Sequence, residues 1–340
     1  MKTLFQKELS TATILDFTDG FREKTIPIEV RTDRFTGRVS RILDFRWKLP
    51  QSSHDPALIE EARKNCPFCP ERIQLRTPKF PPHILPEGHL RFNETTVIPN
   101  AFPYCSYCGV AIFSETHYLP MTRISESILF NALKAGTLFF NRIHEIDPSA
   151  DFPSINWNYM PTSGGSLFHP HFQVIANPVP TTFWHHLLNS TTEYRNRAGS
   201  SYWSDLILFE KRNKDRYLFS KGGIEFLTSF SPGGIFGEVL AVFSGISSLN
   251  ETTDDAWRHF VSGLAILLKA FDRLHLDNLN MTLLTPMHPE PDFPIQARIM
   301  PRILIPPWKT SDVNYFEKGH DETVVIFSPE DLAAEIRSAE

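Results

Sequence analysis

Long apolar runs are missing from this sequence. No stretch approaches the roughly 18 consecutive apolar residues that a membrane-spanning helix needs. The N-terminal segment MKTLFQKELSTATILDF also has no continuous apolar core of the kind found in signal peptides. We therefore expect no membrane partner, and the cytoplasm is the expected location.

An excess of positive charge is missing as well. The net charge is −5, and no run of Lys and Arg occurs in the 340 residues. A surface that binds nucleic acid must neutralise backbone phosphates with clustered cations. Nucleic acid is therefore not an expected partner.

Cysteine is scarce. The chain has four, arranged as two C-x-x-C pairs, Cys66 with Cys69 and Cys105 with Cys108. In a reducing compartment this arrangement favours metal binding over disulfide bonding. At least one pair is therefore expected to hold a metal ion.

The length of 340 residues suits about two domains. The composition, 41% apolar and 21% charged, is that of a soluble globular protein. Two segments carry apolar residues at helical spacing, 125–146 (SESILFNALKAGTLFFNRIHEI) and 253–275 (TDDAWRHFVSGLAILLKAFDRLH). The second opens with Thr253 and two acidic residues, which suit a helix N-terminus. We predict that both are helices facing the core.

The order of elements around these helices repeats. A strand-like run precedes each helix, at 109–114 and 238–244, and two strand-like runs follow it, SINWNYM and FHPHFQVIANP in the first case and NLNMTLLTP and FPIQARIMPR in the second. Corresponding runs lie roughly 125 residues apart. We predict two copies of one α+β unit, in an N-terminal domain 1–190 and a C-terminal domain 200–340. The polar segment NSTTEYRNRAGSS, with a hinge near 190–205, is predicted to be a surface linker.

The segment GGSLFHPHFQV carries the strongest chemical pattern. Side chains alternate along a strand, so His169, His171 and Gln173 project to one face. An imidazole with one ring nitrogen held as a donor presents the lone pair of the other nitrogen as a nucleophile toward phosphorus.

Groups around His171 suit a phosphoryl-transfer site. Backbone N–H groups of Gly164 and Gly165, with the Ser166 hydroxyl, can stabilise charge on the phosphates, and Gln173 can donate to a non-bridging oxygen. The alternative is that the histidines are merely half-buried strand residues, but their company of Gln and Gly-Gly-Ser favours a functional role. The matching strand of the second half carries Gln296 and Arg298 instead, so only the first half is predicted to be catalytic. Arg298 is a candidate contact for a substrate phosphate.

Two ligand sets can complete a metal site begun by Cys66 and Cys69. One adds Cys105 and Cys108, and the spacing of the two pairs favours it. The other adds His117 of FSETHYLP and His169. A metal on His169 would also orient His171, which favours the mixed set. Four protein ligands imply a structural zinc ion in either case.

Together these residues resemble the galactose-1-phosphate uridylyltransferase family of the histidine-triad superfamily. The family carries a C-x-x-C pair, a strand ending in F-S-x-x-H and an H-P-H-x-Q strand, and NCPFCPER, AIFSETH and HPHFQ resemble them in the same order. The resemblance implies a fold class of α+β type, a duplicated histidine-triad-like unit with helices packed on an antiparallel sheet, and a homodimer.

The resemblance also implies roles for individual residues. It makes His171 the nucleophile, Gln173 the amide that holds the phosphate, Ser166 a phosphate contact, and Asn93 of RFNETTVIPN, with the acidic residue after it, part of the nucleotide pocket. The zinc positions fall on Cys66, Cys69, His117 and His169.

The chain departs from the family at several positions. Family members often carry an H-x-H on the second-half strand that builds another metal site, where this chain has Gln296 and Arg298. We therefore do not expect a second metal site, and His288 and Glu193 resemble no more than remnants of one. Phe172 replaces a Gly, and Leu167 and Phe168 replace an Asn-Pro pair. The resemblance therefore does not specify the base or the sugar.

The predicted activity is transfer of a nucleoside monophosphate from a nucleotide sugar or dinucleotide to a phosphate acceptor, by a ping-pong route through a nucleotidyl-histidine. Galactose metabolism is the pathway that the resemblance suggests. Gln173 in place of a third histidine is typical of relatives that transfer to phosphate. A nucleoside diphosphate-sugar or dinucleoside polyphosphate phosphorylase or hydrolase is a near alternative. A zinc-stabilised nucleotide-binding protein without catalysis is an alternative of another class.

Overall fold

The centre of the molecule is one antiparallel sheet of ten strands. A computed structural model describes residues 4–43, 54–305 and 310–339. The strands lie in the order β4 (Leu90–Phe92), β5 (Thr95–Pro99), β6 (Tyr107–Ile112), β8 (His171–Ala176), β7 (Ser154–Tyr159), β12 (Asn278–Leu284), β13 (Gln296–Arg302), β11 (Val239–Phe243), β10 (Ile224–Thr228) and β9 (Tyr217–Lys221).

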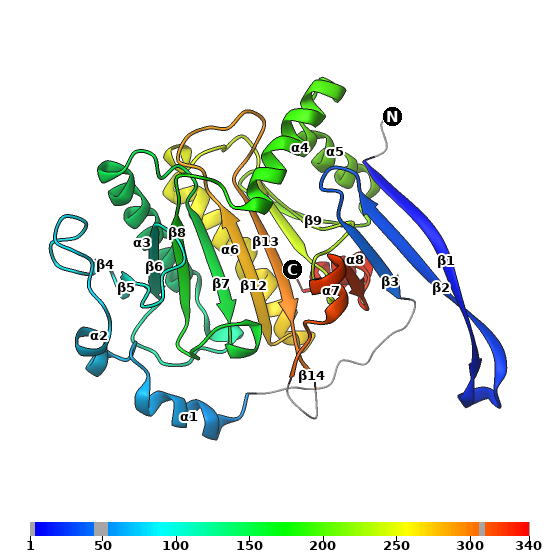
Figure 1. Cartoon of the computed structure of the whole chain (residues 1–340), viewed down its shortest axis with the longest axis horizontal. Coiled ribbons are helices and arrows are strands. Elements are labelled where there is room, and N and C mark those ends of the chain that lie inside the picture. Colours follow the sequence, from blue (N-terminus) through cyan, green and yellow to red (C-terminus); the bar gives the residue numbers. More distant parts are fainter. Residues whose placement is uncertain (1–3, 44–53, 306–309, 340) are drawn as a thin grey trace.

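Two long helices, α3 (Glu126–Ile146) and α6 (Asp254–Arg273), cover one face of this sheet (Figure 1). Ser125 caps α3 by accepting from the N–H of Ile128, and Thr253 caps α6 by accepting from the N–H of Ala256. Both predicted helices are therefore confirmed, and their apolar faces form the main core with the sheet.

The strand order shows the duplication. β4-β5-β6-β8-β7 of the first half is followed across the sheet by β12-β13-β11-β10-β9, which is the same order reversed. The halves join where β7 pairs with β12, and Asn156 lies opposite Thr282 in that pair. The duplicated α+β architecture predicted from the order of elements is thus confirmed, and a single continuous sheet unites the two copies.

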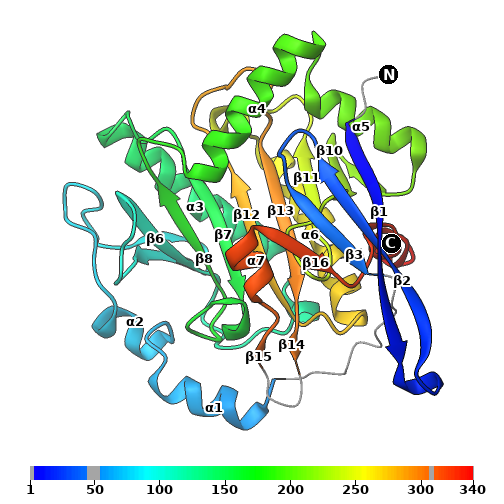
Figure 2. The ribbon, with the colours of Figure 1, turned by 45° about the vertical axis from the view of Figure 1, so that its right-hand side comes forward.

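The segment predicted to be a linker is mostly helical. α4 (Thr182–Ala198) and α5 (Tyr202–Asn213) occupy it, with Gly199 in the left-handed conformation (φ +72°) after α4. The linker prediction is wrong because α4 continues through residues 189–198, and Ser190, Tyr194 and Trp203 within the predicted hinge region are buried. These helices cover part of the second half on the face opposite α6 (Figure 2). The division into domains 1–190 and 200–340 stays a prediction.

A second, smaller sheet has the order β1 (Phe5–Asp16), β2 (Arg22–Asp33), β3 (Val39–Leu43) and β16 (Glu322–Val325). Short elements complete the fold: α1 (Pro56–Asn65), α2 (Pro70–Arg76), β14 (Leu304–Ile305), β15 (Thr310–Ser311), α7 (Tyr315–His320) and α8 (Pro329–Arg337). The β1–β2 ribbon extends away from the body at the side opposite α1 and α2 (Figure 1).

A charged cluster ties the small sheet to α8. Arg31 of β2 donates two hydrogen bonds to the Glu330 carboxylate, at 2.9 and 2.8 Å, and Arg216 donates a third at 2.8 Å. Burial raises the pKa of Glu330, but the two guanidinium groups outweigh it and lower the pKa to about 2. The ionised carboxylate therefore stabilises the folded state.

Replacing Glu330 by Gln should lower the free energy of unfolding at neutral pH by about 2 kcal/mol, a value reduced for partial solvent exposure. The folded-state pKa is depressed, so this stabilisation is complete above the ordinary value of 4.5. The stabilisation by Glu330 is lost as the pH falls from 4.5 through the folded-state pKa of about 2. Urea unfolding across this range measures it, and a difference between wild type and variant that stays constant down to pH 2 would contradict the role of Glu330.

Candidate active site

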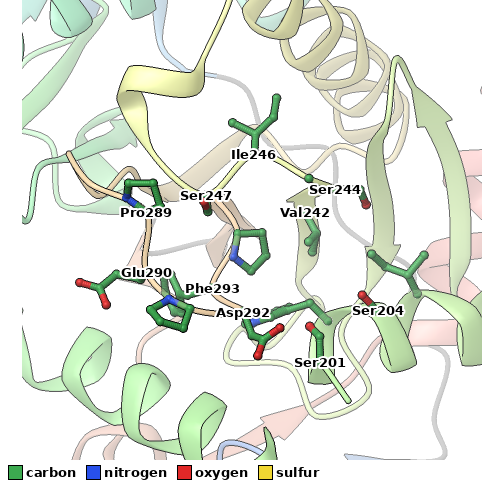
Figure 3. Close-up of a pocket in the computed structure, with 15 residues that line it drawn as sticks. Ser201, Ser204, Val242, Ser244, Ile246, Ser247, Pro289, Glu290, Asp292 and Phe293 are labelled. Atoms are coloured by element: carbon green, nitrogen blue, oxygen red, sulfur yellow. The ribbon is translucent and has the colours of Figure 1, made fainter. Parts of the chain in front are cut away.

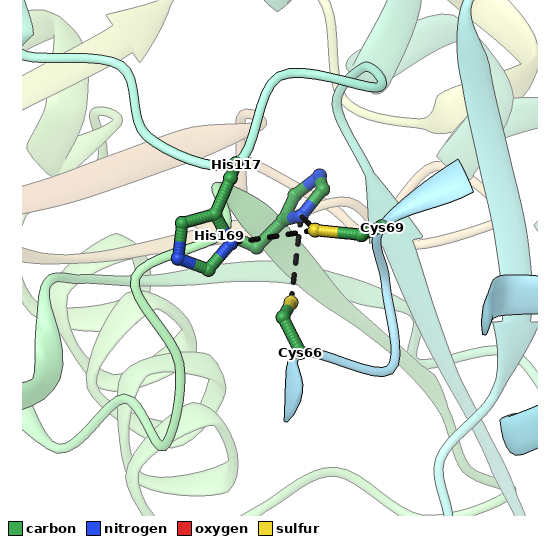
Figure 4. Close-up of side chains that lie close together, drawn as sticks. All are labelled: Cys66, Cys69, His117 and His169. Atoms are coloured by element: carbon green, nitrogen blue, oxygen red, sulfur yellow. Dashed lines mark hydrogen bonds between the residues drawn. The ribbon is translucent and has the colours of Figure 1, made fainter. Parts of the chain in front are cut away.

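Four potential metal ligands meet beside the first half of the sheet. Cys66 ends α1 and Cys69 precedes α2, while His117 follows β6 and His169 precedes β8. All four are buried, and their donor atoms lie within 4.8 Å of one another (Figure 4). The structure thus brings together the mixed set of two thiols and two imidazoles that the sequence analysis favoured.

The spacing of these atoms fits a tetrahedral ion. Cys66 Sγ lies 3.6 Å from His169 Nδ1, and Cys69 Sγ lies 3.6 Å from His117 Nδ1 and 3.9 Å from His169 Nδ1. Bonds of about 2.3 Å to sulfur and 2.0–2.1 Å to nitrogen would place neighbouring S and N atoms about 3.6 Å apart. The four residues can therefore hold a metal with little rearrangement.

Protonation also suits ligation. The Nε2–H of His169 donates to the carbonyl oxygen of Ser114 at 2.8 Å, which leaves the Nδ1 lone pair toward the sulfurs. Burial lowers the pKa of His169 to about 4 and also lowers the pKa of His117, so both rings are neutral at neutral pH. Burial and the neighbouring Cys66 raise the pKa of the Cys69 thiol to about 11, a penalty that a bound dication would remove.

The other cysteine pair does not join this cluster. Cys105 and Cys108 form a disulfide with each other, contrary to the expectation of metal binding. They lie at the start of β6, whereas His117 lies beyond its end, and a six-residue strand spans about 20 Å. The four-cysteine alternative is not assembled for this geometric reason.

His171 is the first residue of β8 and is buried beside the ring of Phe68, at 5.3 Å between centroids. Its Nδ1–H donates to the carbonyl oxygen of His169 at 2.8 Å, and the structure describes no hydrogen bond at Nε2. Burial lowers the pKa of His171. A neutral ring with Nδ1 held as donor and the Nε2 lone pair available is the arrangement required of a nucleophile.

Gln173 lies two residues further along β8, on the same face as His171. Its Oε1 accepts a hydrogen bond from Nδ2 of Asn100 at 3.0 Å. The Oδ1 of Asn100 in turn accepts a hydrogen bond from the backbone N–H of Phe102, at 2.9 Å. The orientation of Asn100 therefore leaves Nε2 of Gln173 as a donor for a ligand.

The sequence analysis missed Asn100. The available signal was its position directly after the strand-like run TTVIP, where an asparagine can close a turn through its own side chain.

Phe172 lies on the opposite face from the histidines. Its side chain is completely buried in the core. The centroid of its ring lies 4.5 Å from the ring centroid of Phe113 and 5.4 Å from that of Trp157. Val174 on the same face fits close to Gly109 and Gly136, where an added Cβ would come within 2.9 and 3.1 Å of it. Phe172, which stands where the resemblance led us to expect glycine, therefore belongs to the core and leaves the polar face of β8 unaltered.

The Gly-Gly-Ser segment forms the loop between β7 and β8. Gly164 has φ +96°, which requires glycine, and a Cβ on Gly165 would lie 3.1 Å from the carbonyl oxygens of Asn158 and Met160. Ser166 is exposed, and the structure describes no contact between it and His171. The loop precedes the potential ligand His169, and it is exposed to solvent at Ser166.

Asn93 is not brought to this site. It lies in the turn between β4 and β5, and its Nδ2 donates to Oδ1 of Asn131 on α3 at 3.0 Å. Asn131 also donates to Glu94, so this pair faces the helix layer. β8 presents His171 on the other face of the sheet, and the structure therefore gives Asn93 no place beside His171.

Arg298 also lies away from His171. Gln173, Asn156, Thr282 and Arg298 form one row across β8, β7, β12 and β13, and three strand spacings amount to about 14 Å. This row makes Arg298 the counterpart of Gln173 and Gln296 the counterpart of His171. The sequence match of Q-A-R with H-P-H instead aligns Gln296 with His169 and Arg298 with His171, so the two alignments differ by two residues.

The contacts of the Arg298 guanidinium are with Glu238 and Phe183 and not with the histidine strand. The guanidinium forms an ion pair with the buried Glu238 and stacks on Phe183, at 4.6 Å from the ring centroid. A direct contact with a phosphate on His171 is not supported by this position.

A cavity of about 470 Å³ lies elsewhere, between α5, the end of β11 and the loop 289–294 (Figure 3). None of the residues of the histidine strand or the Cys-His cluster lines it. The chemistry of the donor atoms therefore places the candidate active site at His171 rather than in this cavity.

Among the described residues, no helix is both long and apolar enough to cross a membrane.

Comparison with known proteins gives one close sequence match and several structural ones. No known family description matches the sequence. An uncharacterized protein of Archaeoglobus fulgidus is 31% identical over 338 residues, which cover 98% of each chain.

Among solved structures, ADP-glucose phosphorylase from Arabidopsis thaliana with bound ADP-glucose matches with a TM-score of 0.69 and 21% identity, over 91% of this chain and 98% of that one. A uridylyltransferase structure matches with a TM-score of 0.65 and 20% identity, over 91% and 98%. These matches confirm the predicted α+β fold class with helices packed on an antiparallel sheet.

Proposed function

We propose that this chain, which belongs to the same family as the Archaeoglobus fulgidus protein and shares the fold of ADP-glucose phosphorylase and uridylyltransferase, transfers a nucleoside monophosphate through a covalent bond to His171. The observation that carries the proposal is the hydrogen bond from Nδ1 of His171 to the carbonyl oxygen of His169. This hydrogen bond fixes the orientation of the His171 ring. Its acceptor belongs to His169, which is itself a member of the Cys-His cluster.

The first step is displacement at the α-phosphorus of the donor. Nε2 of His171 attacks phosphorus, an N–P bond forms, and the P–O bond to the leaving phosphate breaks with its electron pair on that oxygen. The ring becomes positively charged, and the carbonyl oxygen of His169 stabilises the Nδ1–H proton that it retains. Gln173 donates from Nε2 to a non-bridging oxygen as charge grows there.

The second step regenerates the enzyme. An oxygen of an acceptor phosphate attacks phosphorus, and the N–P bond breaks with its electron pair on Nε2. Neither step needs a general base, because the attacking groups are a neutral imidazole and an ionised phosphate. The donor is a nucleotide sugar or dinucleotide, and the acceptor is a sugar phosphate in the transferase case or inorganic phosphate in the phosphorylase case.

Zinc is the metal that the ligand set fits best, since two thiolates and two neutral imidazoles in a tetrahedron are typical of structural zinc. When bound it would anchor the two cysteine-bearing helix ends to His117 and His169. With four protein ligands the ion would leave no position for substrate, so it would contribute by positioning His171. Assembly as a homodimer is a further expectation from the resemblance.

Intact-mass measurement tests the function. The purified chain is mixed separately with UDP-glucose, ADP-glucose, GDP-hexoses and dinucleoside polyphosphates, and the added mass names the nucleotide. Product analysis with and without inorganic phosphate then distinguishes a transferase or phosphorylase from a hydrolase. The absence of any covalent adduct with all donors would favour the non-catalytic nucleotide-binding alternative.

Asn100 provides a separate test of how Gln173 acts. Asn100→Asp keeps an oxygen that accepts from the Phe102 N–H, but it replaces the N–H donor to Gln173 by a second oxygen. The Gln173 amide should therefore rotate so that its Nε2 donates to the introduced carboxylate, and that N–H is then no longer available to the substrate phosphate. We expect a kcat about tenfold lower for Asn100→Asp and for Asn100→Ala, with substrate binding less affected.

The urea midpoint of both variants serves as the control. If Asn100→Asp retained full kcat while Asn100→Ala lost it together with stability, the residue would be structural only.

A further inference from the structure

A second group of possible metal ligands lies at the other end of the central strands. His144 is in the last turn of α3, Asp151 is in the loop between α3 and β7, and His288 is in the loop between β12 and β13. The proposed catalytic cycle uses none of them. Gln296 and Arg298, where the resemblance led us to look for a second metal site, are not part of this group.

The three donor atoms converge without bonding to one another. Oδ1 of Asp151 is 3.8 Å from Nδ1 of His144 and 3.6 Å from Nε2 of His288, and the two rings lie 5.1 Å apart. These distances are too long for hydrogen bonds. Nδ1 of His144 and Oδ1 of Asp151 are nevertheless buried atoms without a hydrogen-bond partner. Two orphaned polar atoms that face each other suggest that something else binds between them.

The spacing distinguishes between coordination geometries. With bonds of about 2.0–2.2 Å, neighbouring N and O ligands are about 3.4 Å apart in a tetrahedron and about 3.0 Å apart in an octahedron. The observed 3.6 and 3.8 Å are closer to the tetrahedral value. Two imidazoles and one carboxylate are also donors that zinc accepts.

The local charge favours a cation as well. Among the described ion pairs, Asp151 has histidine partners and no lysine or arginine partner. A dication bound between these groups would neutralise the Asp151 carboxylate.

We propose that His144, Asp151 and His288 bind a tetrahedral divalent ion of the zinc class, separate from the ion of the Cys-His cluster. Its ligands come from both halves of the chain, next to the hydrogen bond from the N–H of Met287 to the carbonyl oxygen of Asp151, at 3.1 Å. The ion joins the end of α3 to the β12–β13 loop. Residues 289–294 of that loop line the 470 Å³ cavity of Figure 3, so the ion also fixes one wall of that cavity.

The stoichiometry of metal binding tests the proposal. The full-length chain is dialysed to equilibrium against micromolar zinc, and the protein-bound metal is measured by elemental analysis. We expect two ions per chain for wild type and one for His288→Ala and for Asp151→Asn, which keeps the shape of the side chain. His185→Asn, at an exposed histidine of α4, is the matched control and should retain two.

Cobalt-loaded protein assigns each ion to its ligands. A cobalt ion on Cys66 and Cys69 gives an intense thiolate-to-metal charge-transfer absorption, whereas nitrogen and oxygen ligands give only weak visible bands. The two variants should keep the charge-transfer absorption, which also reports that they are folded, and should lose one equivalent of cobalt. A single equivalent in wild type, or a second equivalent that survives both substitutions, would overturn the proposal.

Discussion

Replacing His171 by Asn is expected to abolish formation of the covalent nucleotidyl-enzyme and to lower the rate of transfer by about 10⁴-fold or more. The physical reason is that Asn offers no nitrogen lone pair that can attack phosphorus. Because the amide is smaller and still polar, the strand and the Cys-His cluster should remain intact. An α-labelled nucleotide donor measures the effect, since an N–P bond is labile in acid and stable in base.

His185→Asn is the matched control for this experiment, because His185 is an exposed helix residue. It should label like wild type. Full labelling of the His171 variant would show that another side chain is the nucleophile. Labelling that disappears in both variants would show that the assay reports folding rather than chemistry.

Replacing Cys66 by Ser is expected to remove the thiolate-bound metal ion and to destabilise the chain by several kcal/mol, on the order of 3–5 kcal/mol. The cluster joins segments that lie 48 and 103 residues apart in the sequence, so its loss releases the α1–α2 segment from the sheet. The carbonyl of His169, which holds His171, would lose its anchor with it. Transfer activity should therefore fall together with the metal content.

Cys105→Ser/Cys108→Ser is the control that separates the two cysteine pairs. It removes the disulfide and should leave the metal content and the thiolate absorption of the cobalt form unchanged. Elemental analysis, cobalt spectra and urea unfolding of both proteins measure the difference. If the double variant lost the ion and Cys66→Ser kept it, the mixed ligand set would be wrong.

Patterns within a few residues predicted the regular elements well. The apolar repeat of 3.6 residues and the caps at Ser125 and Thr253 placed both long helices, and these features depend only on neighbouring residues. Alternation along HPHFQ put His171 and Gln173 on one face, as the structure shows. The same local reasoning failed for the segment between the halves, because a few buried aromatic residues outweigh many polar ones in α4 and α5.

Roles that depend on distant contacts were predicted unevenly. Asn93 and Asn100 both follow strand-like residues, and only packing shows that Asn93 faces α3 while Asn100 holds Gln173. The correspondence between halves was two residues off for Arg298, since register is set by hydrogen bonds across β7 and β12 rather than by order along the chain. His144 and Asp151 carried no signal in the sequence at all.

The sequence by itself determined that the chain folds as two copies of an α+β unit and that one strand carries the histidine proposed as the nucleophile. Periodicity, capping and alternation are properties of adjacent residues, and they need no knowledge of the rest of the molecule. Only the tertiary structure decided which groups join that strand. The choice between His117 with His169 and Cys105 with Cys108 depended on which end of β6 each pair occupies, and a distance across a strand exists only once the sheet has formed.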